Sequence, residues 1–115
     1  MQYMLLIYGN EANMLSATQE TARKVMAAYK GYTEAMQKAG VYIGGNRLKP
    51  TSAATAVRVR DGKNQVLDGP YADTKEQLGG YYLIEAPDLD AALSWAARCP
   101  GAAHGTMEVR PIWTA

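Results

Sequence analysis

The sequence contains no phenylalanine, one cysteine (Cys99) and one histidine (His104). A single cysteine cannot form a disulfide within the chain, and one cysteine with one histidine is too few for a Cys/His zinc site in a single chain. No metal site is therefore expected. Because a lone thiol without an export signal is typical of the reducing cytoplasm, we predict a cytoplasmic protein.

The sequence also lacks a large net charge and a long apolar run. Twelve basic and eleven acidic side chains leave a net charge of +1, so no long-range field draws in nucleic acid or an anionic membrane. The apolar run at residues 4–8 is too short to span a bilayer. Neither nucleic acid nor a membrane is expected as a partner. Nucleotide-binding motifs such as G-x-G-x-x-G are absent as well, and no cofactor is expected.

Two segments have the pattern of helices. In the first, apolar side chains recur every three or four residues: Val25, Tyr29, Tyr32, Met36 and Ala39. Ser16 and Gln19 have the spacing of a capping box at its start, and Gly40 can end it. The second helix is predicted to begin at Asp88, whose carboxylate can cap it, and to stop at Cys99-Pro100.

Short apolar segments predict the strands, at residues 3–8, 41–48, 56–60, 65–67, 79–86 and 107–113. Asp61-Gly62 is a strong turn signal that makes residues 56–67 a hairpin. With this hairpin set aside, the element order is that of a ferredoxin-like βαββαβ domain. We therefore predict a single α+β domain over residues 1–115, with an extra hairpin and with both helices on one face of an antiparallel sheet.

The sheet face opposite the helices is predicted to be aromatic. Its candidate rings are Tyr3, Tyr8, Tyr42, Tyr81 or Tyr82, and Trp113. This is more aromatic area than a water-exposed face usually carries. A second copy of the chain would bury it, and a two-fold dimer is the commonest closed assembly, so we predict a homodimer. The alternative is that the rings line an internal pocket or lie under the loops.

His104 and Asp68 are the candidate catalytic residues. Histidine is the side chain that ordinarily changes charge near neutral pH, and His104 lies in a loop of small residues, 101–105. Asp68 opens an Asp-Gly-Pro turn. If it lay near His104, it could orient the ring, and the pair could act as general base and then general acid. The alternatives are a surface histidine that caps a strand or helix and an aspartate that only begins a turn.

Further side chains could bind a small organic molecule: Tyr8, Arg47, Tyr71, Lys75, Glu76 and Tyr82. Arg47 could clamp a carboxylate. Lys75 and Glu76 could contact a substrate just after the Asp68 turn, although such a charged cluster is more often a solvated helix start. Cys99 is interpreted as structural, because nothing in the sequence indicates an activated thiol.

The segment at residues 68–82 closely resembles the signature of the YCII-related proteins known as DGPF-domain proteins. Residues 87–92, Cys99-Pro100 and His104-Gly105 are similar to the same family, so the resemblance covers nearly the whole chain. Tyr71 stands where the family name expects phenylalanine, a change that adds a hydroxyl and keeps the ring.

The resemblance implies a dimeric α+β barrel, in which two ferredoxin-like sheets pack face to face. It also implies a histidine–aspartate pair, which maps onto His104 and Asp68. A few YCII relatives are dehalogenating lyases that act on chlorinated aromatic diols, which implies a cofactor-free acid–base enzyme for a small organic molecule. Genes of the DGPF type often lie beside those of alternative sigma factors, so a non-catalytic ligand-binding or regulatory accessory protein is the alternative.

Overall fold

The structure is a computed structural model that describes residues 1–114. Its strands are β1 (Gln2–Gly9), β2 (Tyr42–Arg47), β3 (Thr55–Arg60), β4 (Lys63–Asp68), β5 (Gln77–Glu85) and β6 (Thr106–Pro111). Its α-helices are α1 (Glu11–Leu15), α2 (Gln19–Lys38) and α3 (Leu89–Arg98), and two short 3₁₀ helices are η1 (Thr51–Ala53) and η2 (Pro100–Ala103). Within residues 1–114, no helix is both long enough and apolar enough to cross a membrane.

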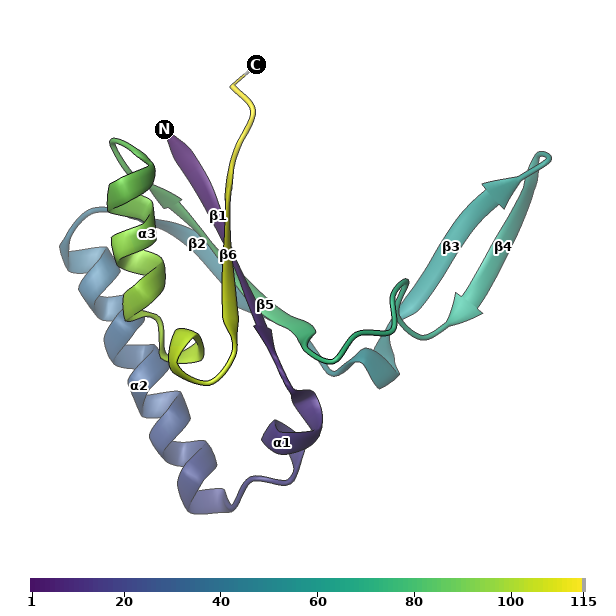
Figure 1. The fold of residues 1–115 in the computed structure, drawn as a ribbon, viewed down its shortest axis with the longest axis horizontal. Coiled ribbons are helices and arrows are strands. Elements are labelled where there is room, and N and C mark those ends of the chain that lie inside the picture. Colours follow the sequence, from purple (N-terminus) through teal and green to yellow (C-terminus); the bar gives the residue numbers. More distant parts are fainter. Residues whose placement is uncertain (115) are drawn as a thin grey trace.

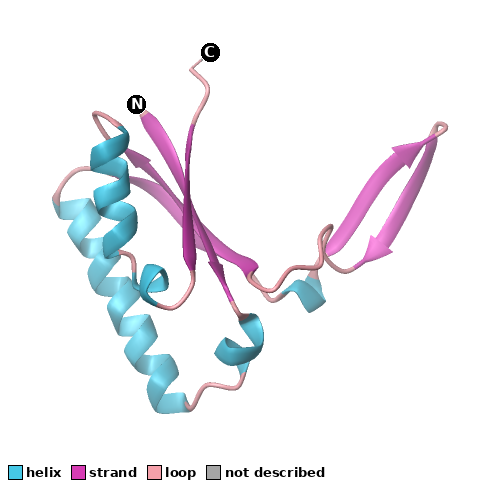
Figure 2. Cartoon of the chain, viewed as in Figure 1, coloured by secondary structure: helices cyan, strands magenta, loops and turns pink. Residues whose placement is uncertain are grey.

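Four strands form an antiparallel sheet in the order β2-β5-β1-β6, with β1 in the interior (Figure 1). The long helix α2 and the shorter α3 lie together on one side of this sheet (Figure 2). This strand order and this layering are those of a ferredoxin-like domain. The predicted α+β fold is therefore confirmed, including the extra hairpin formed by β3 and β4.

The hydrophobic core lies between the sheet and the two helices. Tyr3 and Leu5 of β1 and Ile84 of β5 are buried against Met36 of α2 and Ala92 of α3. Side chains alternate across a strand, so the residues between these buried positions face the other way. The helices therefore shield one side of the sheet from water. No helix or strand of residues 1–114 covers the opposite side.

The open face of the sheet is the side opposite the helices. Register and alternation place these side chains on it: Met4, Leu6, Tyr8, Tyr81, Leu83, Glu108 and Arg110. The predicted aromatic face is partly wrong, because Tyr3 is buried in the core and Tyr42 and Tyr82 also pack on the helix side. Residue type alone does not show which face of the sheet a side chain occupies, because that face depends on strand register.

The predicted N-cap is correct for α3 and wrong for α2. Asp88 caps α3 as expected, because its Oδ1 accepts a 2.9 Å hydrogen bond from the Ala91 amide. The capping box predicted from Ser16 and Gln19 is wrong. Thr18 caps α2 instead, and its hydroxyl accepts from the amide of Thr21 at 3.2 Å. Ser16 has a helical backbone that ends α1, whereas an N-cap residue needs an extended one.

The β3–β4 hairpin, residues 55–68, projects away from the sheet and is termed the arm (Figure 1). Its tip is a tight turn in which Asp61 and Gly62 have positive φ angles of 52° and 73°, as a type I′ turn requires. Its base is closed by a 2.7 Å hydrogen bond from the amide of Gly69 to the carbonyl of Ala54. The arm is therefore a self-contained unit that enters and leaves the body at one place.

Candidate functional site

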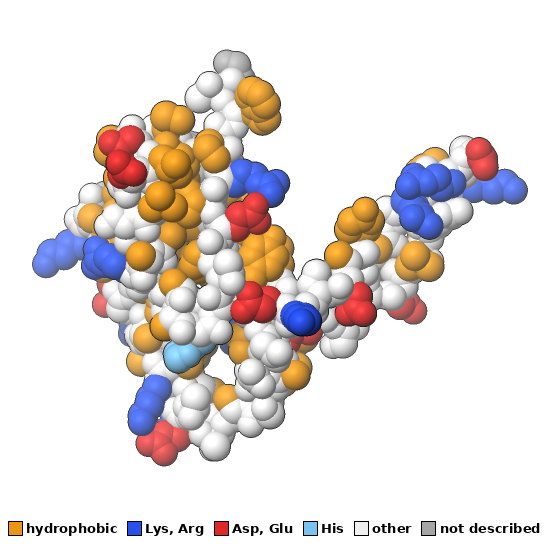
Figure 3. Space-filling view, viewed as in Figure 1, with side chains coloured by type: hydrophobic (Ala, Val, Ile, Leu, Met, Phe, Trp, Pro, Cys, Tyr) orange, Lys and Arg blue, Asp and Glu red, His pale blue; other side chains and the backbone are white. Residues whose placement is uncertain are grey.

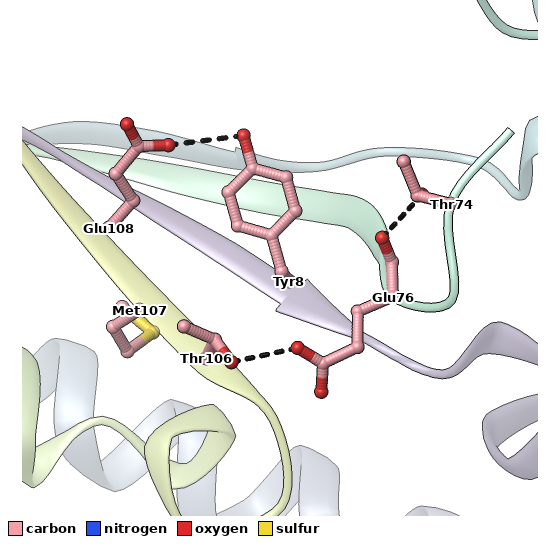
Figure 4. Close-up of a pocket in the computed structure, with 6 residues that line it drawn as sticks. All are labelled: Tyr8, Thr74, Glu76, Thr106, Met107 and Glu108. Carbon is pink, nitrogen blue, oxygen red and sulfur yellow. Dashed lines mark hydrogen bonds between the residues drawn. The ribbon is translucent and has the colours of Figure 1, made fainter. Parts of the chain in front are cut away.

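An open hollow of about 450 Å³ lies where the end of β1, the segment before β5 and the start of β6 meet (Figure 4). We term it the strand-end hollow. It is lined by Tyr8, Thr74, Glu76, Thr106, Met107 and Glu108. Three segments that are far apart in the sequence thus supply carboxylate, hydroxyl and phenol groups to one place.

The register between β1 and β6 places three of these groups on one face. Tyr8 lies directly opposite Thr106, and Glu108 lies two residues further along β6. Residues two apart on a strand share a face, so all three side chains emerge on the open side of the sheet. On its other edge β1 has an irregularity between Ile7 and Tyr8, where the pairing with β5 skips Gly79. The extra residue of this bulge, Gly79, belongs to β5.

Glu108 is held between a phenol and a guanidinium. The hydroxyl of Tyr8 donates to its Oε1 at 3.3 Å, and Arg110 donates to its Oε2 at 2.6 Å. The hydrogen bond and the charge of Arg110 lower the pKa of Glu108, and Glu108 in turn raises the pKa of Arg110. Such an exposed pair contributes little to stability. Its effect is to keep the Glu108 carboxylate ionised at the mouth of the hollow.

Glu76 fixes the other wall of the hollow. The hydroxyl of Thr106 donates to its Oε1 at 2.7 Å, and Thr74 donates to its backbone carbonyl at 2.6 Å (Figure 4). These bonds tie the segment before β5 to the start of β6. The second carboxylate oxygen of Glu76 has no hydrogen-bond partner among residues 1–114, so it can accept from a ligand.

His104 lies beside the hollow without lining it. It is the exposed residue that ends η2, two positions before Thr106. Its loop runs close to β1, because a side chain at Gly105 would collide with the carbonyl of Tyr8. Glycine at this position therefore lets the histidine loop run against the strand that carries Tyr8.

The structure does not bring Asp68 and His104 together within one chain. Asp68 ends β4 at the base of the arm, whereas His104 belongs to the body. In residues 1–114 no hydrogen bond or ion pair joins the two side chains. Their catalytic roles remain predictions.

The other predicted binding residues are distributed over the molecule. Tyr8 and Glu76 line the strand-end hollow. Arg47 ends β2, and its guanidinium lies 3.8 Å from the sulfur of Met26 in α2. Tyr71 is 94% exposed, and Lys75 is exposed as well, both in the segment between the arm and β5.

Tyr82 belongs to the core side of the sheet. Its hydroxyl shares a 3.0 Å hydrogen bond with that of Thr33 in α2, and its ring meets that of Tyr32 edge-on, with centroids 5.4 Å apart. Burial raises the pKa of its phenol. These contacts join the sheet to α2, on the side away from the strand-end hollow.

The whole chain, residues 1–115, matches the family model described as the YCII-related domain. This is a YCII-related protein. The family predicted from its sequence is confirmed. A curated relative, "Uncharacterized protein R00369" of Rhizobium meliloti (strain 1021), is 38% identical over 114 residues, which are 97% of this chain and 92% of the relative.

A solved structure shares the fold of this YCII-related protein. It is that of 5-chloro-2-hydroxyhydroquinone dehydrochlorinase from Burkholderia phenoliruptrix AC1100, in complex with 2,5-dihydroxybenzoquinone. The TM-score is 0.57 at 14% sequence identity, and the match covers 100% of this chain and 96% of that one. At this identity the likeness concerns the fold alone.

Sequence reasoning missed Thr106 and Glu108 of the YCII-related chain. A signal was available in β6, where Thr106, Glu108 and Arg110 alternate with the apolar Met107 and Val109. That alternation places three polar groups on one face of the last strand. It could not show that Tyr8 and Glu76 lie opposite them, because this depends on strand pairing.

The chemistry of the strand-end hollow is that of a hydrogen-bonding site. Its two carboxylates are acceptors when ionised, and its phenol and hydroxyl groups can either donate or accept. No group of three or more His, Cys, Asp or Glu side chains in the described part of the chain could hold a metal ion. The site as built suits a small molecule that carries several hydroxyl groups.

Proposed function

We propose that this YCII-related protein binds a neutral, hydroxyl-rich organic molecule in the strand-end hollow and transfers a proton on it by acid–base catalysis, without a cofactor. The observation that carries the proposal is the convergence of Tyr8, Glu76 and Glu108 on one hollow from three separate segments. A concavity with a few convergent polar groups is the usual form of a ligand site.

The charge of the strand-end hollow favours a neutral ligand. Glu76 and Glu108 both line it, and a ligand with its own negative charge would be repelled by them. Hydroxyl groups of a diol or triol can instead donate to these carboxylates and accept from Tyr8. An aromatic diol would place its ring against the ring of Tyr8.

His104 is assigned the acid–base role, because it is exposed on the loop that leads to Thr106. The reaction class is elimination, in which a base removes a proton from the substrate. The electron pair left behind forms a new double bond, and a halide leaves with its own bonding pair. No oxidant or reductant is consumed, so acid–base groups suffice. The dehydrochlorinase of similar fold supports this class.

The proposal includes a homodimer in which the open faces of two sheets pack together. Leu6, Leu83 and Tyr81 give this face an apolar centre, while Glu108 and Arg110 form a polar rim, as in protein interfaces generally. In the dimer Asp68 would orient His104 of the partner subunit, since the two residues do not meet within one chain. Cytoplasmic residence belongs to the same proposal.

Calorimetric titration with hydroxyhydroquinone tests binding in the hollow. Wild type should bind it, and Glu76→Ala should weaken binding by at least about tenfold through the loss of one charged acceptor. Glu20→Ala, on the exposed surface of α2, is the matched control and should bind as wild type does. An anionic ligand such as 2,5-dihydroxybenzoquinone should bind more weakly. Equal binding by Glu76→Ala and wild type would remove the hollow from consideration.

Release of chloride from 5-chloro-2-hydroxyhydroquinone tests catalysis. His104→Ala should keep the affinity for hydroxyhydroquinone and lose turnover by about 10²–10⁴-fold, the usual contribution of a general acid–base group. If the variant released chloride as fast as wild type, His104 would have no acid–base role.

A non-catalytic ligand-binding or regulatory accessory protein is the second candidate. The observation that favours it is that the His104 side chain has no hydrogen-bond partner in residues 1–114, whereas a catalytic base is normally oriented by a third group. Wild type that binds hydroxyhydroquinone tightly and releases no chloride from its chlorinated form would favour this candidate.

A further inference from the structure

The arm has one apolar face and one basic face. Val57 lies directly opposite Val66, and Val59 lies two residues along the same strand, so the three valines share a face. We term this the valine face. The other face carries Arg58, Arg60 and Lys63, and Figure 3 shows lysine and arginine side chains gathered towards the tip of the arm. Ala56 and Leu67, paired near the base, are the apolar exceptions on that basic face.

The valine face is uncovered in a single chain. Val57, Val66 and Val59 are 65%, 61% and 56% exposed, because the arm projects away from the body (Figure 1). A two-stranded hairpin is at best marginally stable alone in water and needs a surface to pack on. Alternating apolar and polar faces are the pattern of a strand pair with one side buried. The arm thus has the sequence of a packed hairpin, and its valine face has no packing partner among residues 1–114.

The solvent-accessible surface area of the chain indicates how much area a partner could bury. The chain exposes 8363 Å², whereas a compact monomer of 12.5 kDa exposes about 6,200 Å². Its radius of gyration is 16.0 Å, against about 13 Å for a compact domain of this length. The excess area, about 2,200 Å², is within the range that a permanent dimer interface removes from each partner, about 1,000–2,500 Å².

We propose that the valine face of the arm packs on a second copy of this chain and forms part of a homodimer interface distinct from the open face of the sheet. This inference rests on the homodimer of the proposed function and adds a second contact surface to it. A second copy is the fitting occupant because a two-fold axis covers both arms at once, and because a net charge of +1 leaves little repulsion between copies.

Docking of the valine face carries a further residue into the interface. Asp68 pairs with Thr55 at the base of the arm, two positions from Val66, and therefore lies on the valine face. Packing of this face on a second copy places the Asp68 carboxylate against the partner subunit. The arm is thus the part of the chain through which one subunit can supply a charged group to the other.

Adjacent lysine substitutions on opposite faces of the arm test the inference. Val66→Lys puts a charge on the valine face, and Gln65→Lys puts the same charge on the basic face, one residue away. Sedimentation velocity over a dilution series measures the dissociation constant of the dimer. Val66→Lys should raise it at least tenfold, and Gln65→Lys should leave it within about twofold of wild type. Equal dissociation constants for the two variants would overturn the proposal.

Excision of the arm provides a second variant that retains the body. Because Ala54 and Gly69 are hydrogen-bonded at the base, residues 55–68 can be replaced by two glycines without touching the core. This variant should give the circular dichroism of a folded body and a dissociation constant raised at least as far as that of Val66→Lys. An excised variant that dimerises like wild type would overturn the role of the arm.

A substitution on the open face separates this inference from the dimer of the proposed function. Leu83→Lys disrupts the open face and leaves the arm intact. If Leu83→Lys dissociates while Val66→Lys and the excised variant stay dimeric, the open-face dimer stands and the arm proposal fails. If Val66→Lys dissociates while Leu83→Lys stays dimeric, the arm proposal stands and the open-face dimer fails. A wild type that is monomeric at all concentrations overturns both, whether or not hydroxyhydroquinone binds.

Discussion

The hydroxyl of Tyr32 in α2 donates a 2.7 Å hydrogen bond to the backbone carbonyl of Trp95 in α3. The amide of Cys99, which would reach this carbonyl in a continuing helix, bonds to Ala96 instead. The Trp95 carbonyl is thus one of the groups that a helix end leaves unsatisfied, and a side chain from the neighbouring helix satisfies it. The bond joins the two helices at the end of α3.

Tyr32→Phe should destabilise the protein by about 1–3 kcal/mol, because the Trp95 carbonyl loses its donor in a partly buried place. Urea-induced unfolding, followed by circular dichroism, measures the change. Tyr71→Phe removes a hydroxyl from a ring that is 94% exposed and should change stability by less than about 0.5 kcal/mol. Equal effects of the two substitutions would mean that the bond between the helices contributes nothing.

Gly45→Ala should destabilise the protein by about 1–3 kcal/mol, the usual effect of overpacking. A Cβ at Gly45 would lie 2.7 Å from the carbonyl oxygen of Tyr81 and 2.7 Å from the ring of Tyr82. At the adjacent Gly44 a Cβ meets nothing within 4 Å in the described structure, so Gly44→Ala is the matched control. Thermal unfolding of the two variants should separate them, and similar midpoints would contradict the close approach of β2 and β5.

Cys99 should resist alkylation in the folded protein. It is 2% exposed, and burial raises the pKa of its thiol, so little thiolate forms near neutral pH. With iodoacetamide at pH 8, the folded protein should react at least about a hundredfold more slowly than the same protein in urea. A folded thiol that reacted at the unfolded rate would make Cys99 a reactive residue rather than a core residue.

Arg110→Ala should raise the pKa of Glu108 towards that of an ordinary carboxyl group, because Arg110 is the main cause of its low value. Carboxyl ¹³C NMR across the acid range measures this pKa directly. Since the folded pKa of Glu108 is depressed, its contribution to stability is present above the ordinary carboxyl pKa and is lost as pH falls through the folded one. Arg23→Ala in α2 should leave the resonance unchanged.

Stability should fall with rising pH once the medium is more alkaline than about pH 10, the ordinary pKa of tyrosine. Burial raises the pKa of both Tyr29 and Tyr32, so the folded state holds these protons while the unfolded state releases them. Melting temperatures between pH 8 and pH 11 measure the effect. Tyr32→Phe removes one of the two groups and should give a shallower decline than wild type.

Local elements were predictable because their determinants lie within the segment itself. Asp88 caps α3, and Asp61-Gly62 forms the tip of the arm, both through contacts a few residues apart. The face that each strand buries was less predictable, since it depends on pairing with distant strands. Tyr3 and Tyr42 are aromatic residues that the sequence placed on the open side and the structure packs on the core.

The candidate site was predictable in part. Tyr8 and Glu76 were predicted as binding residues, and both line the strand-end hollow. Thr106 and Glu108 were not, because the pairing of β1 with β6 alone places them beside Tyr8. The separation of Asp68 from His104 depends on the direction in which the arm leaves the body, for which no local sequence pattern exists.

The order of the strands has a consequence for the synthesis of the chain. β1 is an interior strand whose two neighbours, β5 and β6, are made after it, and β6 ends only at Pro111. Its apolar residues 4–8 therefore leave the ribosome long before any strand exists to pair with them. The sheet can close only when β6 has emerged as far as Pro111. Until then β1 is an apolar segment without its partner strands, the kind of segment through which a partly folded chain aggregates.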